Sequence, residues 1–507
     1  MLRSAASVAV ATSSSRVLGY VRDMVIAATF GAGPAADAFF VAFRIPNFLR
    51  RLFAEGAFSQ AFVPVLSQYR TQREPAEVRD LVAHTLGTLG AVLLGTALLA
   101  VLASPLLVWL LAPGFGDDPQ RGALTGTLLR VTFWYLPLVS LAAAVGGVLN
   151  TFGRYFAPAL TPLFLNLAMI AAAVWLAPRL DVPVLALAIG VVVGGLLQLL
   201  WQLPSLRATG NLVRPRVGFS HPGVRRILTL MGPGVFGSSV AQINLMFDTI
   251  VASFLATGSV SWLYYADRLV EFPLGVLAIA FATVILPRLS REHAGNDPQA
   301  FSRTLDWGLR WVVLVGLPAA AALGVLAGPL LGTLFHYGAF DTHSVHMARQ
   351  ALWAFAPGLV AFMAIKVLAP GYYARQDTRT PMRIGVAAML ANIGITLVLV
   401  WPLQHAGLAA ATSLAAYLNA LLLLRGLRRS GVYRPQPGWR QFLCRVAAAT
   451  AVMTLLLWLG SGTLDVWLAR SAAERGLHLM TWVLAGLFSY GAVLLALRLP
   501  LTSLRRP

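Results

Sequence analysis

Apolar residues follow one another along this chain in runs of about 20, separated by short polar segments. A helix rises about 1.5 Å per residue, so about 20 apolar residues span the roughly 30 Å hydrocarbon core of a bilayer. The composition agrees, because 58% of the 507 residues are hydrophobic, 11% are charged and the mean hydropathy is +0.73. Soluble domains carry about 25% charged residues. We therefore expect an all-α integral membrane protein.

The apolar runs predict about 14 transmembrane helices. The expected spans are residues 5–30, 35–68, 82–111, 122–151, 158–177, 183–204, 224–255, 259–287, 306–335, 344–373, 381–401, 406–425, 440–460 and 478–499. These runs are too long for the strands of a membrane barrel, and they lack the two-residue alternation that such strands show.

Basic residues are distributed unevenly over the segments between these helices. If the N-terminus is cytoplasmic, 24 arginines fall in cytoplasmic segments and only four fall in outer loops, namely Arg121, Arg179, Arg470 and Arg475. Cytoplasmic loops of membrane proteins carry an excess of Lys and Arg. We therefore expect both termini in the cytoplasm. Topology then explains most of the net charge of +20, and no nucleic-acid partner is expected.

Two parts of the chain share short strings at nearly the same offset. Residues 28–30 match residues 252–254 at an offset of 224, and residues 64–67 match residues 287–290 at an offset of 223. Six expected spans separate the copies, so both copies have the same orientation, as in transporters whose two lobes frame a central site. The expected domains are an N-lobe, a C-lobe and a C-terminal helix pair, at residues 1–210, 211–430 and 431–507.

Ionisable residues gather inside the first, second and eighth expected spans, where they are costly and usually face a cavity. The basic members are Arg16, Arg22, Arg44, Arg50, Arg51 and Arg268, and the acidic members are Asp23, Asp37, Glu55, Asp267 and Glu271. By spacing, Arg16 shares a helix face with Asp23, and Asp37 shares one with Arg44 and Arg51. Guanidinium groups bind phosphate through two parallel hydrogen bonds. The cluster predicts a site for a phosphate-bearing substrate, and ion pairs that only lock the helices together are the alternative.

Oxygen-bearing side chains in other spans indicate a second site. Asp248 lies in the middle of the seventh span, Asn392 and Thr396 share a face of the eleventh, and Thr412 lies in the twelfth. Such oxygen ligands suit a small hard cation. Hydrogen-bonded contacts between helices are the alternative.

The energy source is constrained by what the sequence lacks. Lys366 is the only lysine, and it does not follow the glycine-rich loop that binds ATP phosphates. Direct ATP hydrolysis is therefore not expected, and an ion gradient or the membrane potential remains. The single cysteine, Cys444, excludes a disulfide framework and a cysteine-based zinc site. We expect a transporter rather than an enzyme.

Several longer strings resemble one known family. They are residues 15–23, 30–33, 37–47, 50–64, 258–273, 366–377 and 435–439. Together they resemble the MurJ (MviN) family of bacterial lipid II flippases, which belongs to the multidrug/oligosaccharidyl-lipid/polysaccharide exporter superfamily. The likeness covers essentially the whole chain.

This resemblance implies two six-helix lobes around a V-shaped cavity and a groove for a polyprenyl tail on the last two helices. It implies a substrate site at Arg16, Arg22, Asp37, Asn47, Arg50, Glu55 and Arg268, and it selects Arg50 where spacing left Arg51 open. Some family members bind sodium in the second lobe, and the matching positions here are Asp248, Asn392, Thr396 and Thr412. Thr396 stands where an acid is expected. No other cofactor is implied.

The resulting hypothesis is a flippase of the bacterial inner membrane. It would move lipid II, an undecaprenyl-pyrophosphate-linked disaccharide-pentapeptide, to the periplasmic leaflet by alternating access, driven by the membrane potential or an ion gradient. The expected partners are lipid II, membrane lipids and the cell-wall synthesis machinery. A flippase for another polyprenyl-linked glycan, a drug/cation antiporter and a membrane glycosyltransferase are the alternatives.

Overall fold

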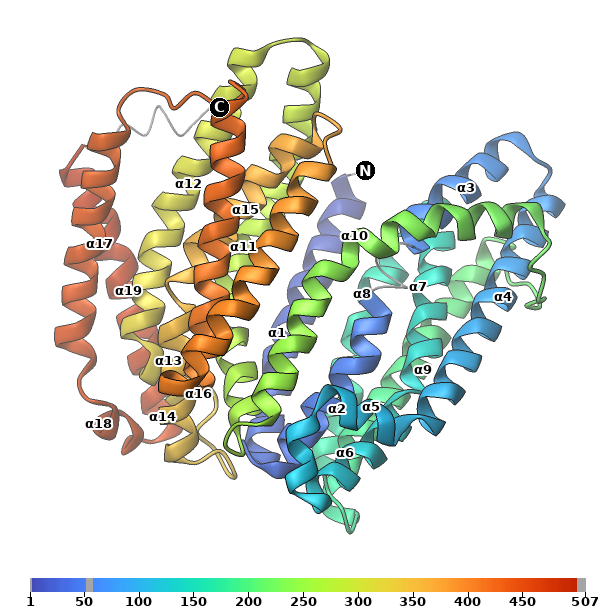
Figure 1. Ribbon diagram of the computed structural model, residues 1–507, viewed down its shortest axis with the longest axis horizontal. Helices are drawn as coiled ribbons and strands as arrows, with labels where there is room; N and C mark the ends of the chain where they lie inside the picture. Colours follow the sequence, from blue (N-terminus) through green and yellow to red (C-terminus); the bar gives the residue numbers. More distant parts are fainter. Residues whose placement is uncertain (1, 52–57, 499–507) are drawn as a thin grey trace. The chain divides into compact units, whose positions relative to one another are not determined.

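The computed structural model describes residues 2–51 and 58–498, and all regular secondary structure within them is helical (Figure 1). This confirms the prediction of an all-α fold. The physical reason is that hydrocarbon offers no partner for backbone N–H and C=O groups, so each spanning segment has to satisfy its own. The chain divides into two compact units, residues 1–260 and 261–507, which are described separately.

The first unit is built around α8 and α9, which pack along each other. α1 packs on α8, α7 on α9, α2 on α6, and α10 on α3. The long helices of this unit are α1 (Leu2–Phe30), α2 (Pro34–Arg50), α3 (Phe58–Gln72), α4 (Pro75–Leu102), α5 (Ser104–Leu111), α6 (Pro119–Thr132), α7 (Tyr135–Thr151), α8 (Phe156–Ala171), α9 (Leu185–Ala208) and α10 (Pro222–Ser253). Short turns of other helix types complete it at η2 (Pro113–Asp117), η3 (Ala172–Leu176) and η4 (Ala177–Arg179).

The second unit is built around α12, α15 and α16. α15 packs on both α12 and α16, α14 packs on α16, and α17 packs between α12 and α19. Its helices are α11 (Ser259–Ala294), α12 (Pro298–Val325), α13 (Ala327–Leu334), α14 (Thr342–Phe355), α15 (Gly358–Tyr373), α16 (Arg379–Arg429), α17 (Trp439–Ser461), α18 (Leu464–Leu468) and α19 (Ala472–Ala496).

The helices lie close to the expected spans, but several spans are interrupted. The expected span at 82–111 is broken at Ala103, and the span at 306–335 is broken at Leu326. Conversely, α16 covers two expected spans, which meet at the non-helical residue Gln404. Among the described residues, eight helices are long and apolar enough to cross a membrane, or nine if α14 and α15, bent by 44°, form one span. The count of 14 stays a prediction.

One helix lies close to the expected boundary between the lobes. α10 follows residue 210, after which the expected C-lobe begins, and it packs on α3 and α4 within the first unit. The expected span at 35–68 corresponds to α2 and α3, with residues 52–57 outside the described part of the chain. The boundaries of the lobes stay a prediction.

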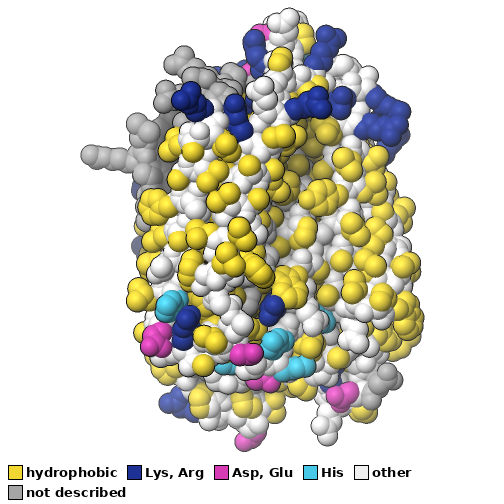
Figure 2. All heavy atoms as spheres, turned by 90° about the vertical axis from the view of Figure 1, so that its left-hand side faces the viewer, with side chains coloured by type: hydrophobic (Ala, Val, Ile, Leu, Met, Phe, Trp, Pro, Cys, Tyr) yellow, Lys and Arg dark blue, Asp and Glu magenta, His cyan; other side chains and the backbone are white. Residues whose placement is uncertain are grey.

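The surface of the second unit is largely apolar, as expected for a surface that faces lipid. Figure 2 shows a broad apolar face, with most basic side chains along one edge and histidine and acidic side chains mainly toward the opposite edge. Trp401 and Trp458, both in the second unit, have highly exposed side chains. A soluble protein would not expose so much apolar area.

A buried carboxylate fixes the connection between α16 and α17. Asp306 on α12 accepts hydrogen bonds through Oδ1 from the Tyr433 hydroxyl (2.9 Å) and the Gln436 N–H (3.1 Å). The indole N–H of Trp439 donates to the same oxygen (2.6 Å), and Arg310 Nε donates to Oδ2 (2.7 Å). Burial and the neighbouring carboxylate raise the pKa of Tyr433, which keeps its hydroxyl protonated and donating. The network sets where α17 begins.

Replacing Asp306 by Asn is expected to destabilise the protein by about 3–5 kcal/mol, because the Arg310 guanidinium stays buried and loses its counter-charge. Denaturant unfolding of the purified protein in detergent would measure this. Asp181→Asn, at an exposed loop position, is the control and should change stability by less than about 0.5 kcal/mol. Equal stability of the two variants would contradict this role of Asp306.

Candidate functional site

Arg22 is held in a buried cage between α1 and α8. Its side chain is 8% exposed, and its Nε and Nη2 atoms both donate to Oδ1 of Asp23, at 2.9 and 2.6 Å. Its Nη1 atom donates to Oδ1 of Asn166 on α8 at 3.0 Å. The Asn166 amide in turn donates to the Ser15 carbonyl at 3.1 Å. The guanidinium is therefore both neutralised and fixed in direction.

This arrangement differs from what spacing indicates. Adjacent residues on a helix point about 100° apart, so spacing placed Asp23 with Arg16 rather than with Arg22. The long Arg22 side chain turns back to reach Asp23, while Arg16 lies on an exposed part of α1. Asn166 was missed because it lies 144 residues away from Arg22 along the chain.

Asp37 lies in the first turn of α2 and is fully buried. Its Oδ2 accepts from Arg121 Nη2 on α6 at 2.5 Å and from the Gly258 N–H at 2.7 Å. The Arg121 guanidinium also lies 3.8 Å above the Phe115 ring. Asp37 thus joins α2, α6 and the segment after α10, which is a positioning role within the first unit. This pair could not be predicted from the sequence, because Arg121 is one of the four arginines expected in outer loops.

Other expected substrate residues of the first unit have partners on neighbouring turns and helices. Arg50 Nε donates to Oδ1 of Asn47, three residues earlier on α2, at 2.9 Å. Arg44 Nη1 donates to the Thr249 hydroxyl on α10 at 2.6 Å. Both arginines are partly exposed. Glu55, the remaining expected residue of this unit, lies outside the described residues.

Arg268 belongs to the second unit and lies on α11. Its Nη1 atom donates to Oε2 of Glu271 at 2.6 Å, and its guanidinium lies 5.6 Å from the centre of the Tyr264 ring. The side chains of Arg268 and Glu271 are 29% and 45% exposed. Arg268 therefore combines a nearby counter-charge with access to solvent, as a residue that exchanges anions requires.

The expected cation ligands of the second unit lie on α16. Asn392 and Thr396 are one turn apart and almost completely buried. Among the described residues, the Thr396 hydroxyl oxygen has no hydrogen-bond partner. A buried hydroxyl without a partner is costly, and a bound cation would satisfy it. These two residues therefore fit a cation site.

The other two expected ligands are placed differently. Thr412 follows the non-helical residue Gln404 on α16, and its hydroxyl already donates to the Leu408 carbonyl at 3.0 Å. Asp248 is a half-buried residue of α10, in the first unit, and its Oδ2 atom accepts from Asn244 at 3.4 Å. The sodium site stays a prediction.

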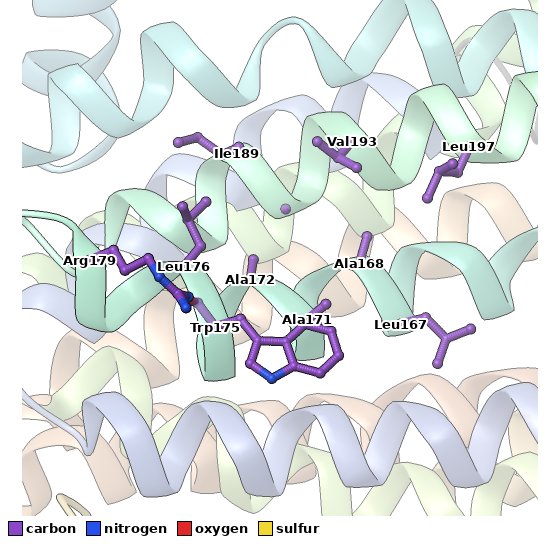
Figure 3. Close-up of a pocket in the computed structure, with 11 residues that line it drawn as sticks. Leu167, Ala168, Ala171, Ala172, Trp175, Leu176, Arg179, Ile189, Val193 and Leu197 are labelled. Carbon is purple, nitrogen blue, oxygen red and sulfur yellow. The ribbon is translucent and has the colours of Figure 1, made fainter.

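An apolar groove of about 470 Å³ runs between α8 with its extension and α9 (Figure 3). It is lined by Leu167, Ala168, Ala171, Ala172, Trp175, Leu176, Arg179, Ile189, Gly190, Val193 and Leu197. A Cβ atom at Gly190 would overlap the Ala172 side chain, so this glycine allows the two helices to approach closely. Arg179 is the only charged lining residue, so the groove suits a hydrocarbon chain better than a charged headgroup.

A family profile described as “Lipid II flippase MurJ” matches residues 26–477. The chain belongs to this family. Its relatives include a “Probable lipid II flippase MurJ” of Vibrio cholerae, 49% identical over 100% of this chain and 98% of that protein. A “Lipid II flippase MurJ” of Burkholderia cenocepacia is 44% identical over 88% of this chain and 87% of that protein.

Solved structures agree with this family. “Lipid II flippase MurJ, inward closed conformation” has a TM-score of 0.80 at 25% identity and covers 95% of this chain and 97% of its own. An inward-facing multidrug resistance MATE transporter of the MOP superfamily has a TM-score of 0.70 at 14% identity, covering 82% and 95%, which shows a shared fold. The MurJ family and the apolar helices make this chain a multi-pass transporter of the inner membrane, as the sequence predicts.

Asp37→Asn is expected to destabilise this MurJ-family protein by about 3–5 kcal/mol, since the buried Arg121 guanidinium would lose its anion. The double variant Asp37→Asn/Arg121→Gln should cost less than the sum of the two single changes, because neither partner is then left charged and unpaired. Denaturant unfolding of all three variants measures this coupling. Strictly additive effects would contradict a direct Asp37–Arg121 pair.

Proposed function

We propose that this chain moves lipid II from the cytoplasmic to the periplasmic leaflet of the bacterial inner membrane. The observation that carries the proposal is membership of the lipid II flippase MurJ family over residues 26–477. Lipid II joins a polyprenyl tail to a pyrophosphate and a polar headgroup, so its passage needs a path that shields the charge from hydrocarbon. Buried and partly exposed arginines supply cationic groups for that path.

The contacts of Arg22 suggest how the pyrophosphate is received. A buried guanidinium is stabilised by an anion beside it, and losing that anion costs several kcal/mol. Asp23 holds this place in the present structure, through Nε and Nη2 of Arg22. A pyrophosphate that enters would share the Arg22 guanidinium with Asp23, because a displaced Asp23 carboxylate would be left buried and unpaired. Release of the substrate then restores the original pair.

Arg268 also lies beside a carboxylate, in the second unit. Its partner Glu271 is 45% exposed, so this pair is weaker than a buried one and is more easily opened by a substrate anion. Arg16 and Arg50, with Asp37, Asn47 and Glu55, complete the proposed substrate site. In this set, Asp37 acts as a positioning residue through Arg121 and Gly258.

The membrane potential supplies a direct driving force in this proposal. Pyrophosphate is anionic, and the cytoplasmic side is electrically negative, so outward movement is favoured by about 2.3 kcal/mol per negative charge at 100 mV. No phosphate-binding ATPase loop surrounds Lys366, the only lysine. We therefore infer transport without ATP hydrolysis by this chain, through alternating access of two lobes.

The orientation follows from the distribution of arginines. The last turns of α11 and α16 carry Arg291, Arg428 and Arg429. The hydrogen bonds between the Ser302 hydroxyl and the backbone of Arg434 place the starts of α12 and α17 together. We assign this basic end to the cytoplasm, with both chain termini on the same side.

A flippase for another polyprenyl-pyrophosphate-linked glycan would use the same arginine chemistry, but the matching relatives named above are lipid II flippases and do not favour it. A drug/cation antiporter should have a more acidic cavity. The cell-wall synthesis machinery remains the proposed partner at the outer face, because it consumes flipped lipid II.

Arg22→Lys and Arg22→Ala are both expected to reduce lipid II translocation by about tenfold or more, because lysine keeps the charge but loses the bidentate fork. Fluorescent lipid II in proteoliposomes, with the leaflets distinguished by a membrane-impermeant quencher, measures the rate. Arg73→Ala, at an exposed helix end, is the matched control and should retain wild-type transport. Full transport by folded Arg22→Lys protein would remove the pyrophosphate role of Arg22.

Sodium binding is tested by Thr396→Val, which removes the buried hydroxyl at nearly constant volume. Wild-type protein should unfold at a higher temperature in NaCl than in choline chloride of equal ionic strength, since a ligand that binds only the folded state stabilises it. The variant should lose this difference, whereas Thr127→Val, at an exposed position on α6, should keep it. The absence of a sodium-specific shift in wild type would contradict the site.

A further inference from the structure

Three potential metal ligands meet where the connection between α9 and α10 reaches the first turns of α4. None of them belongs to the proposed substrate site. Asp80 and His84 lie one turn apart on α4, and His221 precedes α10. His84 Nδ1 lies 3.3 Å from Asp80 Oδ1, and His221 Nε2 lies 3.3 Å from Asp80 Oδ2. One ligand atom from each residue lies within 4.8 Å of the other two.

The fold brings these residues together through close backbone contacts. The Arg216 N–H donates to the Ala83 carbonyl at 2.9 Å, and the Gly218 N–H donates to the Thr88 hydroxyl at 3.0 Å. A Cβ atom at Gly218 would overlap the His84 ring, so glycine is required for this approach. The segment between α9 and α10 is therefore hydrogen-bonded to α4 before α10 begins.

Each of the two rings directs one nitrogen toward the Asp80 carboxylate. His221 Nδ1 accepts from the Gly223 N–H at 3.1 Å, so its Nε2 atom is the one directed at the carboxylate. The rings of His84 and His221 stack with centroids 5.0 Å apart and planes 21° apart. His84 Nδ1 also lies 2.9 Å from the Asp80 carbonyl, which can only accept, so a metal bound at Nδ1 would displace the proton donated there.

We propose that Asp80, His84 and His221 form a Zn²⁺ site with a fourth position for water. Zinc binds nitrogen and carboxylate oxygen at about 2.0–2.1 Å in a tetrahedron, which separates neighbouring ligand atoms by about 3.3 Å. Each ring nitrogen lies at this distance from one carboxylate oxygen, His84 Nδ1 from Oδ1 and His221 Nε2 from Oδ2, so a small rotation of the Asp80 carboxylate would present one oxygen to both. Two imidazoles exclude a magnesium or calcium preference, because those ions select oxygen ligands. Arg216 lies 4.0 Å from Asp80 but is 69% exposed, so it can move aside.

The site would act on the connection rather than on the substrate. Its ligands come from α4 and from the residue that caps α10, so a bound ion would cross-link these two elements. The metal-bound protein should then hold the start of α10 more firmly on α4. This effect does not depend on lipid II and is separable from the proposed flippase function.

The test uses the full chain in detergent with its affinity tag removed, because a histidine tag would itself bind zinc. Isothermal titration with Zn²⁺ should show one ion per chain, and Co²⁺ should give the strong visible absorption of four-coordinate geometry. His84→Ala and His221→Ala should each weaken binding by about tenfold or more, whereas His293→Ala, an exposed histidine on α11, should bind like wild type.

Asp80→Asn tests whether zinc binding can be lost without loss of the fold. It keeps a side chain that can hydrogen-bond both rings but removes the anionic ligand, so its unfolding temperature without metal should stay close to that of wild type. The increase in unfolding temperature that Zn²⁺ causes in wild type should be lost. If wild type binds no stoichiometric zinc, or if His221→Ala binds it as tightly, the three residues form a hydrogen-bonded contact and the proposal is overturned.

Discussion

A guanidinium inside an apolar helix bundle has to keep an anion beside it, and much of this structure is arranged to meet that requirement. Three buried arginines each pair with an aspartate at hydrogen-bond distance. The pairs are Arg22–Asp23, Arg121–Asp37 and Arg310–Asp306. The pair of Arg121 and Asp37 joins α6 to α2, whereas the other two pairs each lie within one helix and reach distant elements through additional hydrogen bonds. Removing one partner of such a pair would leave a buried charge, which is far more costly than losing a surface salt bridge.

The same requirement separates structural pairs from pairs suited to transport. Asp37 and Asp306 accept additional hydrogen bonds from backbone or ring N–H groups, so their arginines are held in place by several contacts. Arg268 differs in its surroundings, because the side chain of its partner Glu271 is 45% exposed. A pair that solvent can reach is weaker than a buried one and opens more easily. The proposed pyrophosphate path therefore includes the solvent-accessible pair at Arg268.

The sequence predicts the class of this protein well because hydrocarbon imposes a simple rule. Runs of about 20 apolar residues become helices, and α9 (Leu185–Ala208) and α17 (Trp439–Ser461) lie within a few residues of the expected spans. Breaks within spans are harder to predict. The breaks at Ala103 and Leu326 are each followed by a proline in the first turn of the next helix, Pro105 and Pro329, which cannot donate a backbone hydrogen bond. Pro46, however, lies inside the continuous helix α2, so proline alone does not predict where a span breaks.

Partner choice was the least predictable part of the candidate site. Spacing along one helix can show which residues share a face, but Asp37 pairs with Arg121, 84 residues away, and Arg22 with Asn166. Neither pairing leaves a pattern in a single sequence. The Asp80–His84 spacing was visible on α4, yet His221 joins them only because Gly218 lets the connection approach. Long-range contacts of this kind need the folded structure.

The central claim is tested most directly by the sidedness of lipid II in cells. The protein would be depleted in a strain without a redundant flippase, and lipid II in the outer leaflet would be measured with a periplasmic enzyme that cleaves only exposed headgroups. The account predicts that lipid II becomes protected on the cytoplasmic side and that wild-type protein restores cleavage. Unchanged cleavage after depletion would contradict a lipid II flippase and leave only the transporter fold.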